Sequence, residues 1–252
     1  MLELRAVSKA FDEAGPPVLE GVSLAVSPGE FCCVLGPSGC GKSTLLHLIA
    51  GFESPTDGQI RFRDQAVRAP GRDRGVVFQD ANAALFPWLT TEQNVEFGLR
   101  LAGVRPEARR ERVRHYLRLV GLEAHGHKYP RQLSGGMQQR LQIARALALE
   151  PVALLMDEPF ASLDAHTRAR MHGELLRIWA ATGTTILFVT HDIAEAVTLA
   201  DRIAVLSAGP RAAIRRVVPV TLPRPRDPTV EGFAHLFGEV RELLDTVESD
   251  GR

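Results

Sequence analysis

The chain has 252 residues, 45% of them hydrophobic and 24% charged, and its 30 lysines and arginines are balanced by 30 aspartates and glutamates. This composition is typical of a globular protein, and a net charge of zero gives no global reason to expect a nucleic-acid partner. The N-terminus lacks the apolar core of a signal peptide, and no stretch approaches the roughly eighteen apolar residues of a membrane helix. We therefore expect any membrane role to come through a partner.

Five short strands are predicted in the first part of the chain. Leu2–Val7 and Val18–Val26 alternate apolar and polar residues, which is typical of half-buried strands and favours an antiparallel N-terminal sheet. Phe31–Leu35 is apolar throughout, as in a strand buried on both faces. Gln59–Arg63 follows a turn signal, and Gly75–Phe78 is a short apolar strand.

The three cysteines are predicted to be reduced thiols. Cys32 and Cys33 are adjacent, which makes them poor disulfide partners, and Cys40 lies within a glycine-rich loop. Reduced thiols are the usual state in the cytosol, so we expect a cytosolic protein.

That glycine-rich loop lies between the strand ending at Leu35 and a helix predicted over Leu45–Ala50. Its residues are Gly36, Pro37, Ser38, Gly39, Cys40, Gly41, Lys42, Ser43 and Thr44. Such a loop binds phosphate, because its backbone N–H groups and the following helix N-terminus attract anions. Lys42 would reach the terminal phosphates, and the Ser43 hydroxyl would coordinate Mg²⁺. A plain glycine turn is the alternative, but the four specified positions arise by chance in roughly one per cent of chains of this length.

Helical periodicity dominates residues 94–149. Pro106 suits the first position of a helix, and the apolar side chains that follow it have helical spacing: Val113, Tyr116, Leu117 and Val120. Several arginines lie between them, but Glu107 and Glu111 are interleaved, which favours a solvated helix face over a nucleic-acid-binding stripe.

The second half of the chain alternates strands and helices. The predicted strands are Val152–Met156, Thr184–Val189, Arg202–Leu206 and Ala212–Val220, and a helix is predicted over Ala165–Ala181. Asp192–Glu195 resembles a capping box that opens another helix.

A proline-rich linker, Leu222–Pro228, leads to a C-terminal segment with coiled-coil spacing. Its apolar residues are Val230, Phe233, Phe237, Val240, Leu244 and Val247. Because the spacing covers too few heptads for a coiled coil, we expect the segment to dock on its own domain, with a partner contact as the alternative.

Two acidic residues follow the buried strand that ends at Met156. Ligands of open α/β sheets bind at the carboxyl ends of strands, so Asp157 is placed to hold Mg²⁺. Glu158 would be ionised at neutral pH and could accept a proton from a water that attacks the γ-phosphorus. The alternative, in which the pair only caps a turn, is weakened by the phosphate loop in the same chain.

A second anion site is predicted at the start of another helix. Ser134, Gly135 and Gly136 precede the helical run Met137–Leu149, and a hydroxyl with two glycines at a helix start suits a phosphate group. A serine that only caps its helix is the alternative.

In their order, these motifs resemble those of the ATP-binding-cassette (ABC) ATPase subunits of membrane transporters, over nearly the whole chain. Residues 36–44 are similar to the Walker A loop, Gln79 to the Q-loop glutamine, residues 133–140 to the signature, residues 152–159 to Walker B, residues 162–164 to the D-loop and His191 to the H-loop histidine.

The resemblance implies an α/β fold. It consists of a P-loop NTPase core with a mixed sheet, an N-terminal antiparallel β subdomain and an inserted α-helical subdomain. Residues 1–84 and 152–221 would form the core and the β subdomain, residues 85–151 the helical subdomain, and residues 222–252 a linker and C-terminal helix.

The resemblance also implies ATP sites shared between two stacked cassettes. Ser134, Gly135 and Gly136 would contact the γ-phosphate held by the partner's Lys42, and Asp164 of the D-loop joins the nucleotide-binding residues. A dimer is therefore expected, with a homodimer as the default.

Further roles in ATP binding and hydrolysis follow from the same motifs. Lys42, Gln79, Glu158 and His191 would be catalytic, with His191 holding the attacking water. Mg²⁺ would be held by Ser43, Gln79 and Asp157. Phe11 matches the aromatic residue that stacks on adenine, and a buried core phenylalanine is the alternative.

The implied function is ATP hydrolysis in a bacterial importer of nitrate, sulfonate, taurine or a similar solute, on the cytoplasmic face of the inner membrane. Four stretches resemble that group: Asp73–Gln79, Phe86–Trp88, Asp157–Arg168 and Leu222–Pro228. The expected partners are permease subunits that contact the Gln79 loop and, indirectly, a solute-binding protein, but no nucleic acid. The alternatives are a cassette for another solute, a soluble cassette ATPase of DNA repair or translation, and a regulatory cassette that does not hydrolyse ATP.

Overall fold

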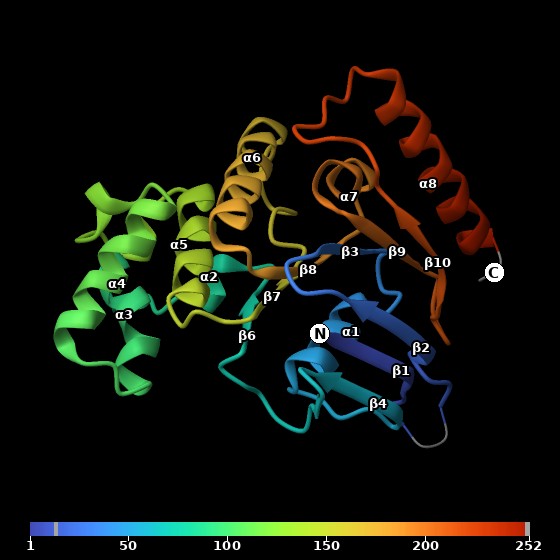
Figure 1. Ribbon diagram of the computed structural model, residues 1–252, viewed down its shortest axis with the longest axis horizontal. Coiled ribbons are helices and arrows are strands. Elements are labelled where there is room, and N and C mark those ends of the chain that lie inside the picture. The colour runs from blue at the N-terminus through green and yellow to red at the C-terminus, as the bar shows by residue number, and fades with distance from the viewer. Residues whose placement is uncertain (13–14, 250–252) are drawn as a thin grey trace. The chain divides into compact units, whose positions relative to one another are not determined.

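The computed structural model describes residues 1–12 and 15–249 (Figure 1). The chain forms two compact units, Met1–Gly71 with Thr185–Arg252, and Arg72–Thr184. No helix in the described ranges is both long and apolar enough to cross a membrane.

The first unit contains an antiparallel sheet of four strands in the order β2-β1-β4-β5. Its strands are β1 (Leu2–Lys9), β2 (Leu19–Val26), β4 (Asp57–Phe62) and β5 (Gln65–Ala66). Leu4 faces Leu24 on one side and Ile60 on the other, and all three are buried. The alternating pattern of the sequence therefore gives the predicted antiparallel sheet with one apolar face.

The second sheet of this unit has β3 (Phe31–Leu35) between β8 (Thr185–Thr190) and β9 (Arg202–Leu206), both parallel to it, and β10 (Ile214–Pro219) antiparallel to β9. Every residue of β3 and β8 is buried. Continuous apolar runs thus form the strands buried on both faces, as predicted, and the sheet is mixed.

The described residues of the first unit also form three helices: α1 (Lys42–Ala50), α7 (Ile193–Leu199) and α8 (Glu231–Ser249). Helix α8 packs on α7 and β9 (Figure 1). Among residues 231–247 of α8, the buried side chains are Phe233, Leu236, Val240, Leu244 and Val247. The predicted docking of the tail on its own domain is confirmed, but Val230 is exposed and Leu236 belongs to the buried face.

The second unit contains the parallel pair β6 (Arg74–Val77) and β7 (Ala153–Asp157). Its helices are α2 (Ala81–Ala84), α3 (Thr91–Leu101), α4 (Pro106–Leu119), α5 (Gly135–Leu147) and α6 (Ala165–Thr182), with short 3₁₀ turns at Glu123–His125 and Pro130–Gln132. Helices α3, α4 and α5 pack on one another, and α2 packs on α5.

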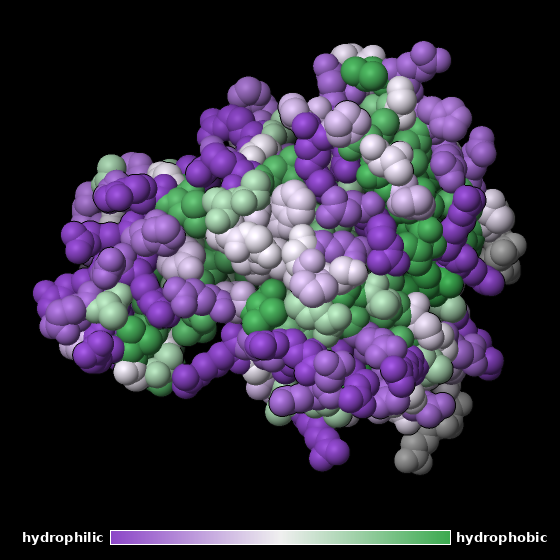
Figure 2. Space-filling model, viewed as in Figure 1, coloured by the Kyte–Doolittle hydropathy of each residue, from purple (hydrophilic) through white to green (hydrophobic). Residues whose placement is uncertain are grey.

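Helix α4 shows why the helical period was visible in the sequence. Pro106 is its first residue, and the four apolar residues predicted to share a face are all buried. Its arginines form ion pairs, for example Arg109 with Glu96 at 2.6 Å and Arg112 with Glu150 at 3.2 Å. The surface over α3 and α4, on the left of Figure 2, is accordingly hydrophilic.

Candidate functional site

The glycine-rich loop connects β3 to α1, as predicted. A Cβ atom at Gly36 would lie 3.0 Å from the Leu206 carbonyl oxygen, so this position has no room for a side chain. Gly41, the residue before α1, has φ = 100°, a left-handed conformation that favours glycine. The loop is therefore held close to the sheet and turns sharply into the helix.

The Lys42 side chain folds back into this loop. Only 4% of the residue is exposed, and its Nζ donates hydrogen bonds to the carbonyl oxygens of Gly36 at 2.9 Å and Pro37 at 2.8 Å. The ammonium thus lies in the concavity of the loop next to the positive end of the α1 dipole. Ser43 is exposed in the first turn of the same helix, and both side chains fit a polyphosphate with its Mg²⁺.

His191 comes directly after β8, the strand that is paired with β3 and therefore next to this loop. In the parallel pair of β3 and β8, Leu35 lies opposite Thr190, so Gly36 and His191 follow neighbouring strands at the same edge. His191 is exposed at this edge. Of the predicted residues in the first unit, the fold therefore brings Lys42, Ser43 and His191 to one edge of the sheet.

The residues after His191 correct one prediction. Asp192 is the N-cap of α7 and accepts hydrogen bonds from the N–H groups of Ala194 and Glu195. The Glu195 carboxylate does not complete a capping box; it accepts the Thr190 hydroxyl at 2.6 Å, and that hydroxyl oxygen accepts the Asp192 N–H. These bonds hold the backbone on both sides of His191.

In the second unit, Gln79 and the two acidic residues also lie at the carboxyl ends of paired strands: Asp157 is the last residue of β7, and Glu158 and Gln79 come after β7 and β6. Val77 of β6 lies opposite Met156 of β7, so the residues after each strand meet at the same edge. Asp157 is buried, Gln79 is exposed, and Glu158 has φ = 40°. A non-glycine residue in the left-handed region is strained, and such strain is concentrated at functional sites.

The signature residues lie at the N-terminus of α5. Ser134 is the N-cap and its hydroxyl accepts the Met137 N–H at 3.4 Å, so its capping role is satisfied. Ser134 and Gly135 are exposed, whereas Gly136 is buried with Thr167 3.0 Å from the site of a Cβ atom. Besides the capping role of Ser134, the exposed N-terminus of this 13-residue helix also fits the predicted anion site.

Asp164 is the N-cap of α6. Its carboxylate accepts the Thr167 N–H at 3.0 Å, and this hydrogen bond lowers the pKa of Asp164. The residue is exposed, so the carboxylate is both ionised and accessible at neutral pH.

Phe11 lies on the surface with 63% of its area exposed, and Lys9 Nζ is 4.9 Å from its ring centroid. The alternative of a buried core phenylalanine is therefore wrong. An exposed ring remains compatible with stacking on a flat base.

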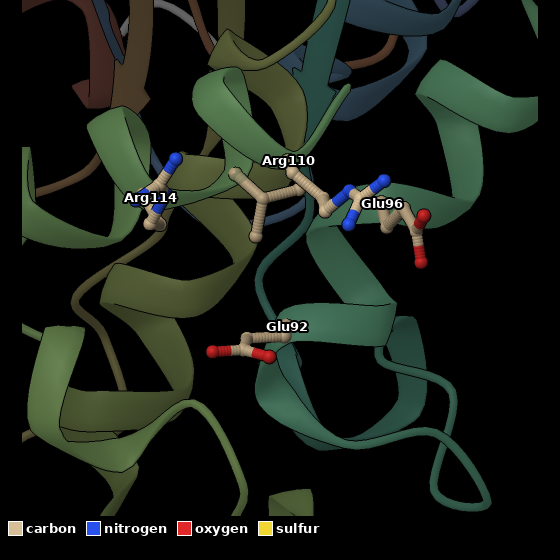
Figure 3. A pocket seen from close by; sticks show the side chains of 5 residues that line it. Glu92, Glu96, Arg110 and Arg114 are labelled. Atoms are coloured by element: carbon tan, nitrogen blue, oxygen red, sulfur yellow. The ribbon is translucent and has the colours of Figure 1, made fainter. Parts of the chain in front are cut away.

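A cavity of about 450 Å³ lies between α3 and α4 (Figure 3). Glu92 and Glu96 line it from α3, and Arg110, Val113 and Arg114 line it from α4. None of these residues belongs to a predicted motif, and charges of both signs on an open surface give it no clear preference for a nucleotide.

Residues 19–161 match the ABC transporter family. The nitrate import ATP-binding protein NrtD of Synechocystis sp. is 50% identical over 205 residues, which are 81% of this chain and 76% of that protein. The taurine import ATP-binding protein TauB of Chromobacterium violaceum is 50% identical over 213 residues, 84% of this chain and 81% of that protein. A solved dimer of the ATP-binding cassette MJ0796, in a post-hydrolysis state bound to ADP and Pi, is 34% identical with a TM-score of 0.75 and covers 88% of this chain and 100% of that chain.

The chain therefore belongs to the ABC transporter family. It has the α/β cassette fold and is an ATP-binding ATPase, as the motifs predicted.

Several polar residues outside the motifs, buried or half-buried, were missed by the sequence reasoning. All four bond to backbone groups of other segments: Gln142 and Arg145 on α5, Asn94 on α3 and Arg226 in the linker. Their signal in the sequence is weak, because a polar residue in an apolar helical pattern looks the same whether it faces solvent or a loop.

Proposed function

We propose that the chain is the ATP-hydrolysing subunit of a bacterial importer for a small solute such as nitrate, a sulfonate or taurine. The main support is the pair of relatives at 50% identity whose names give nitrate import and taurine import. The intact set of Lys42, Glu158 and His191 supports a hydrolysing cassette rather than a regulatory one.

In this proposal the phosphate loop, residues 36–44, binds the phosphates of ATP. Lys42 would exchange its two carbonyl partners for phosphate oxygens, which are stronger acceptors because they are charged. Ser43, Gln79 and Asp157 would hold Mg²⁺. When bound, the ion neutralises the developing charge on the phosphate oxygens.

Glu158 acts as the general base. It accepts a proton from the water that attacks the γ-phosphorus, while His191 orients that water. The exposed ring of Phe11 would stack on the adenine.

Two copies of the chain would be needed for hydrolysis. Ser134, Gly135, Gly136 and Asp164 would act on the ATP bound by the partner copy, and the solved cassette MJ0796 is dimeric. Within the chain, residues 85–151 would be the helical subdomain, residues 1–84 and 152–221 the ATP-binding core with its β subdomain, and residues 222–252 the linker and tail.

The membrane partners would be permease subunits that contact the segment from Gln79 to Trp88. Trp88 is 70% exposed, and exposed tryptophans are enriched at binding hot spots. This contact would hold the chain at the cytoplasmic face of the inner membrane. Solute specificity would lie in the permease and in a solute-binding protein.

The proposal is tested by purifying the tagged chain in mild detergent at its native expression level and identifying the proteins that accompany it. We expect a polytopic membrane protein in about equal amount. A preparation with soluble partners or nucleic acid alone would contradict the transporter function and favour a role in repair or translation. The Trp88→Asp variant tests the proposed contact itself. Its yield of the membrane protein should fall below that of the native chain.

A further inference from the structure

The backbone just before Gln79 is held by a buried side chain of the signature helix. Both amide atoms of Gln142 on α5 bond to Phe78: Oε1 accepts the Phe78 N–H, and Nε2 donates to the Phe78 carbonyl oxygen at 3.0 Å. Gln142 is fully buried. Because its amide can satisfy both backbone groups of one residue, the position of Phe78 is tied to that of α5.

A second side chain of α5 holds the same segment further along. Arg145 donates a hydrogen bond to the Ala84 carbonyl oxygen at 2.7 Å, and its guanidinium lies 5.3 Å from the centroid of the Phe86 ring. Phe86 in turn packs on Trp88, with the ring centroids 5.7 Å apart. These contacts therefore form a continuous path from Arg145 on α5, through Phe86, to the exposed indole ring of Trp88.

The far end of the segment is fixed to a different helix. Asn94 on α3 is fully buried, accepts the Phe86 N–H, and donates to the carbonyl oxygens of Phe86, Leu89 and Thr90. Segment 78–90 thus bridges α5 and α3, and a shift of α5 relative to α3 must deform it.

The geometry of α5 connects these bonds to the signature. Gln142 lies seven residues after Gly135, which is two turns and roughly 10 Å along the helix, and Arg145 follows one turn later. Residues at these spacings share one face of the helix. A helix of 13 residues moves as a rigid element over that distance.

We propose that Gln142 and Arg145 are positioning residues that couple the nucleotide state at Ser134 to Gln79 and Trp88. When the α5 N-terminus takes up the phosphate of a partner-bound ATP, the helix carries Phe78 and Ala84 with it. This shifts Gln79 and changes the surface that Trp88 presents. The inference rests on the proposed function, since it assigns the means by which the same ATP site signals to the permease.

The test uses the fluorescence of Trp88. The chain has two tryptophans, so in the full-length Trp179→Phe protein Trp88 is the single reporter. We expect a non-hydrolysable ATP analogue with Mg²⁺ to change its emission and its quenching by acrylamide. Adding Gln142→Leu or Arg145→Met should reduce that change at least about fivefold, the lower end of typical coupling between sites.

Three measurements make the result decisive. The affinity for the nucleotide without Mg²⁺ should stay within about twofold of the parent, because the phosphate loop lies in the other unit and Gln79 would act on the metal ion; a twofold change is a small fraction of a typical coupling. Melting temperatures identify variants that fail to fold, and Arg112→Met, which removes an arginine of α4 paired with Glu150, is the matched control that should keep the full response.

A full Trp88 response in folded Gln142→Leu and Arg145→Met proteins would overturn the inference. The inference would also be overturned if the parent protein bound nucleotide without any change in the fluorescence of Trp88. A parent that binds no nucleotide would overturn the proposed function, and this inference with it.

Discussion

Single residues show how burial sets the chemistry of the cassette. Cys32 and Cys33 lie in β3 with no exposed surface, and burial raises the pKa of Cys32 to about 12 and that of Cys33 well above its usual range. Both are free thiols, as predicted. In the folded protein they are therefore protonated and poor nucleophiles.

We predict that neither thiol reacts with Ellman's reagent in the folded Cys40→Ser protein at pH 8, whereas both react in guanidinium chloride. Because the folded protein retains these protons, stability is unaffected below the unfolded pKa of 9.0 and falls as the pH rises from there towards 12. Rapid labelling of the native protein at pH 8 would show that β3 opens readily.

Among single residues, some positions were predictable from the sequence and others were not. The phosphate loop was recognisable because its glycines, lysine and serine have fixed spacing and each has a chemical reason. Glu195 was assigned to a capping box from spacing alone, but its carboxylate bonds to the Thr190 hydroxyl. A choice between two nearby donors depends on side-chain rotamers, which the sequence does not encode locally.

At the scale of elements, the predicted proline-rich linker, Leu222–Pro228, is hydrogen-bonded to the end of α7. The buried Arg226 donates hydrogen bonds to the carbonyl oxygens of Val197, Thr198 and Ala200 at the end of α7. It also bonds to the carbonyls of Leu222 and Val220. Burial lowers its pKa to about 10, which still leaves it charged at neutral pH.

We predict that Arg226→Met lowers the free energy of unfolding by about 3 kcal/mol, since it leaves several buried carbonyls without a donor. Denaturant unfolding followed by circular dichroism measures this loss. The exposed Arg241 on α8 provides the control, and Arg241→Met should change stability by no more than about 0.5 kcal/mol. Equal losses for both variants would mean that the linker bonds add nothing to stability.

The strands and long helices were predictable because their signals are repetitive. The predicted Phe31–Leu35 and Arg202–Leu206 strands match β3 and β9 residue for residue, and Pro106 marks the start of α4. Helix α2 was not predicted, because four residues are too few for a periodic signal; its N-cap Asp80 is the local cue. The stretch after Gln79 therefore holds a short helix where the sequence analysis predicted none.

On the scale of the whole molecule, the chain carries one phosphate loop and one signature, so in the proposed function hydrolysis would require a second cassette. We predict that Glu158→Gln binds MgATP but hydrolyses it on the order of a hundredfold more slowly than the native chain. The nucleotide then persists, and the variant should elute as a dimer with MgATP and as a monomer without it.

The control for this variant is Glu107→Gln, which changes an exposed glutamate of α4. Its turnover and elution should match those of the native chain. Near-normal hydrolysis by Glu158→Gln would remove Glu158 from the base role, and a monomer at all nucleotide concentrations would contradict the shared site.

The bonds that Asn94 makes have a consequence for how this protein can evolve. The turn that presents Trp88 takes its shape from main-chain groups of residues 86–90 bound to a buried amide. Main-chain bonds are indifferent to the identity of the side chain at position 88. With Trp88 at the permease contact, as in the proposed function, a lineage could exchange that surface residue to suit a diverging permease while the interior stays constant, and an engineer could use the same position to build transporter pairs that do not cross-react.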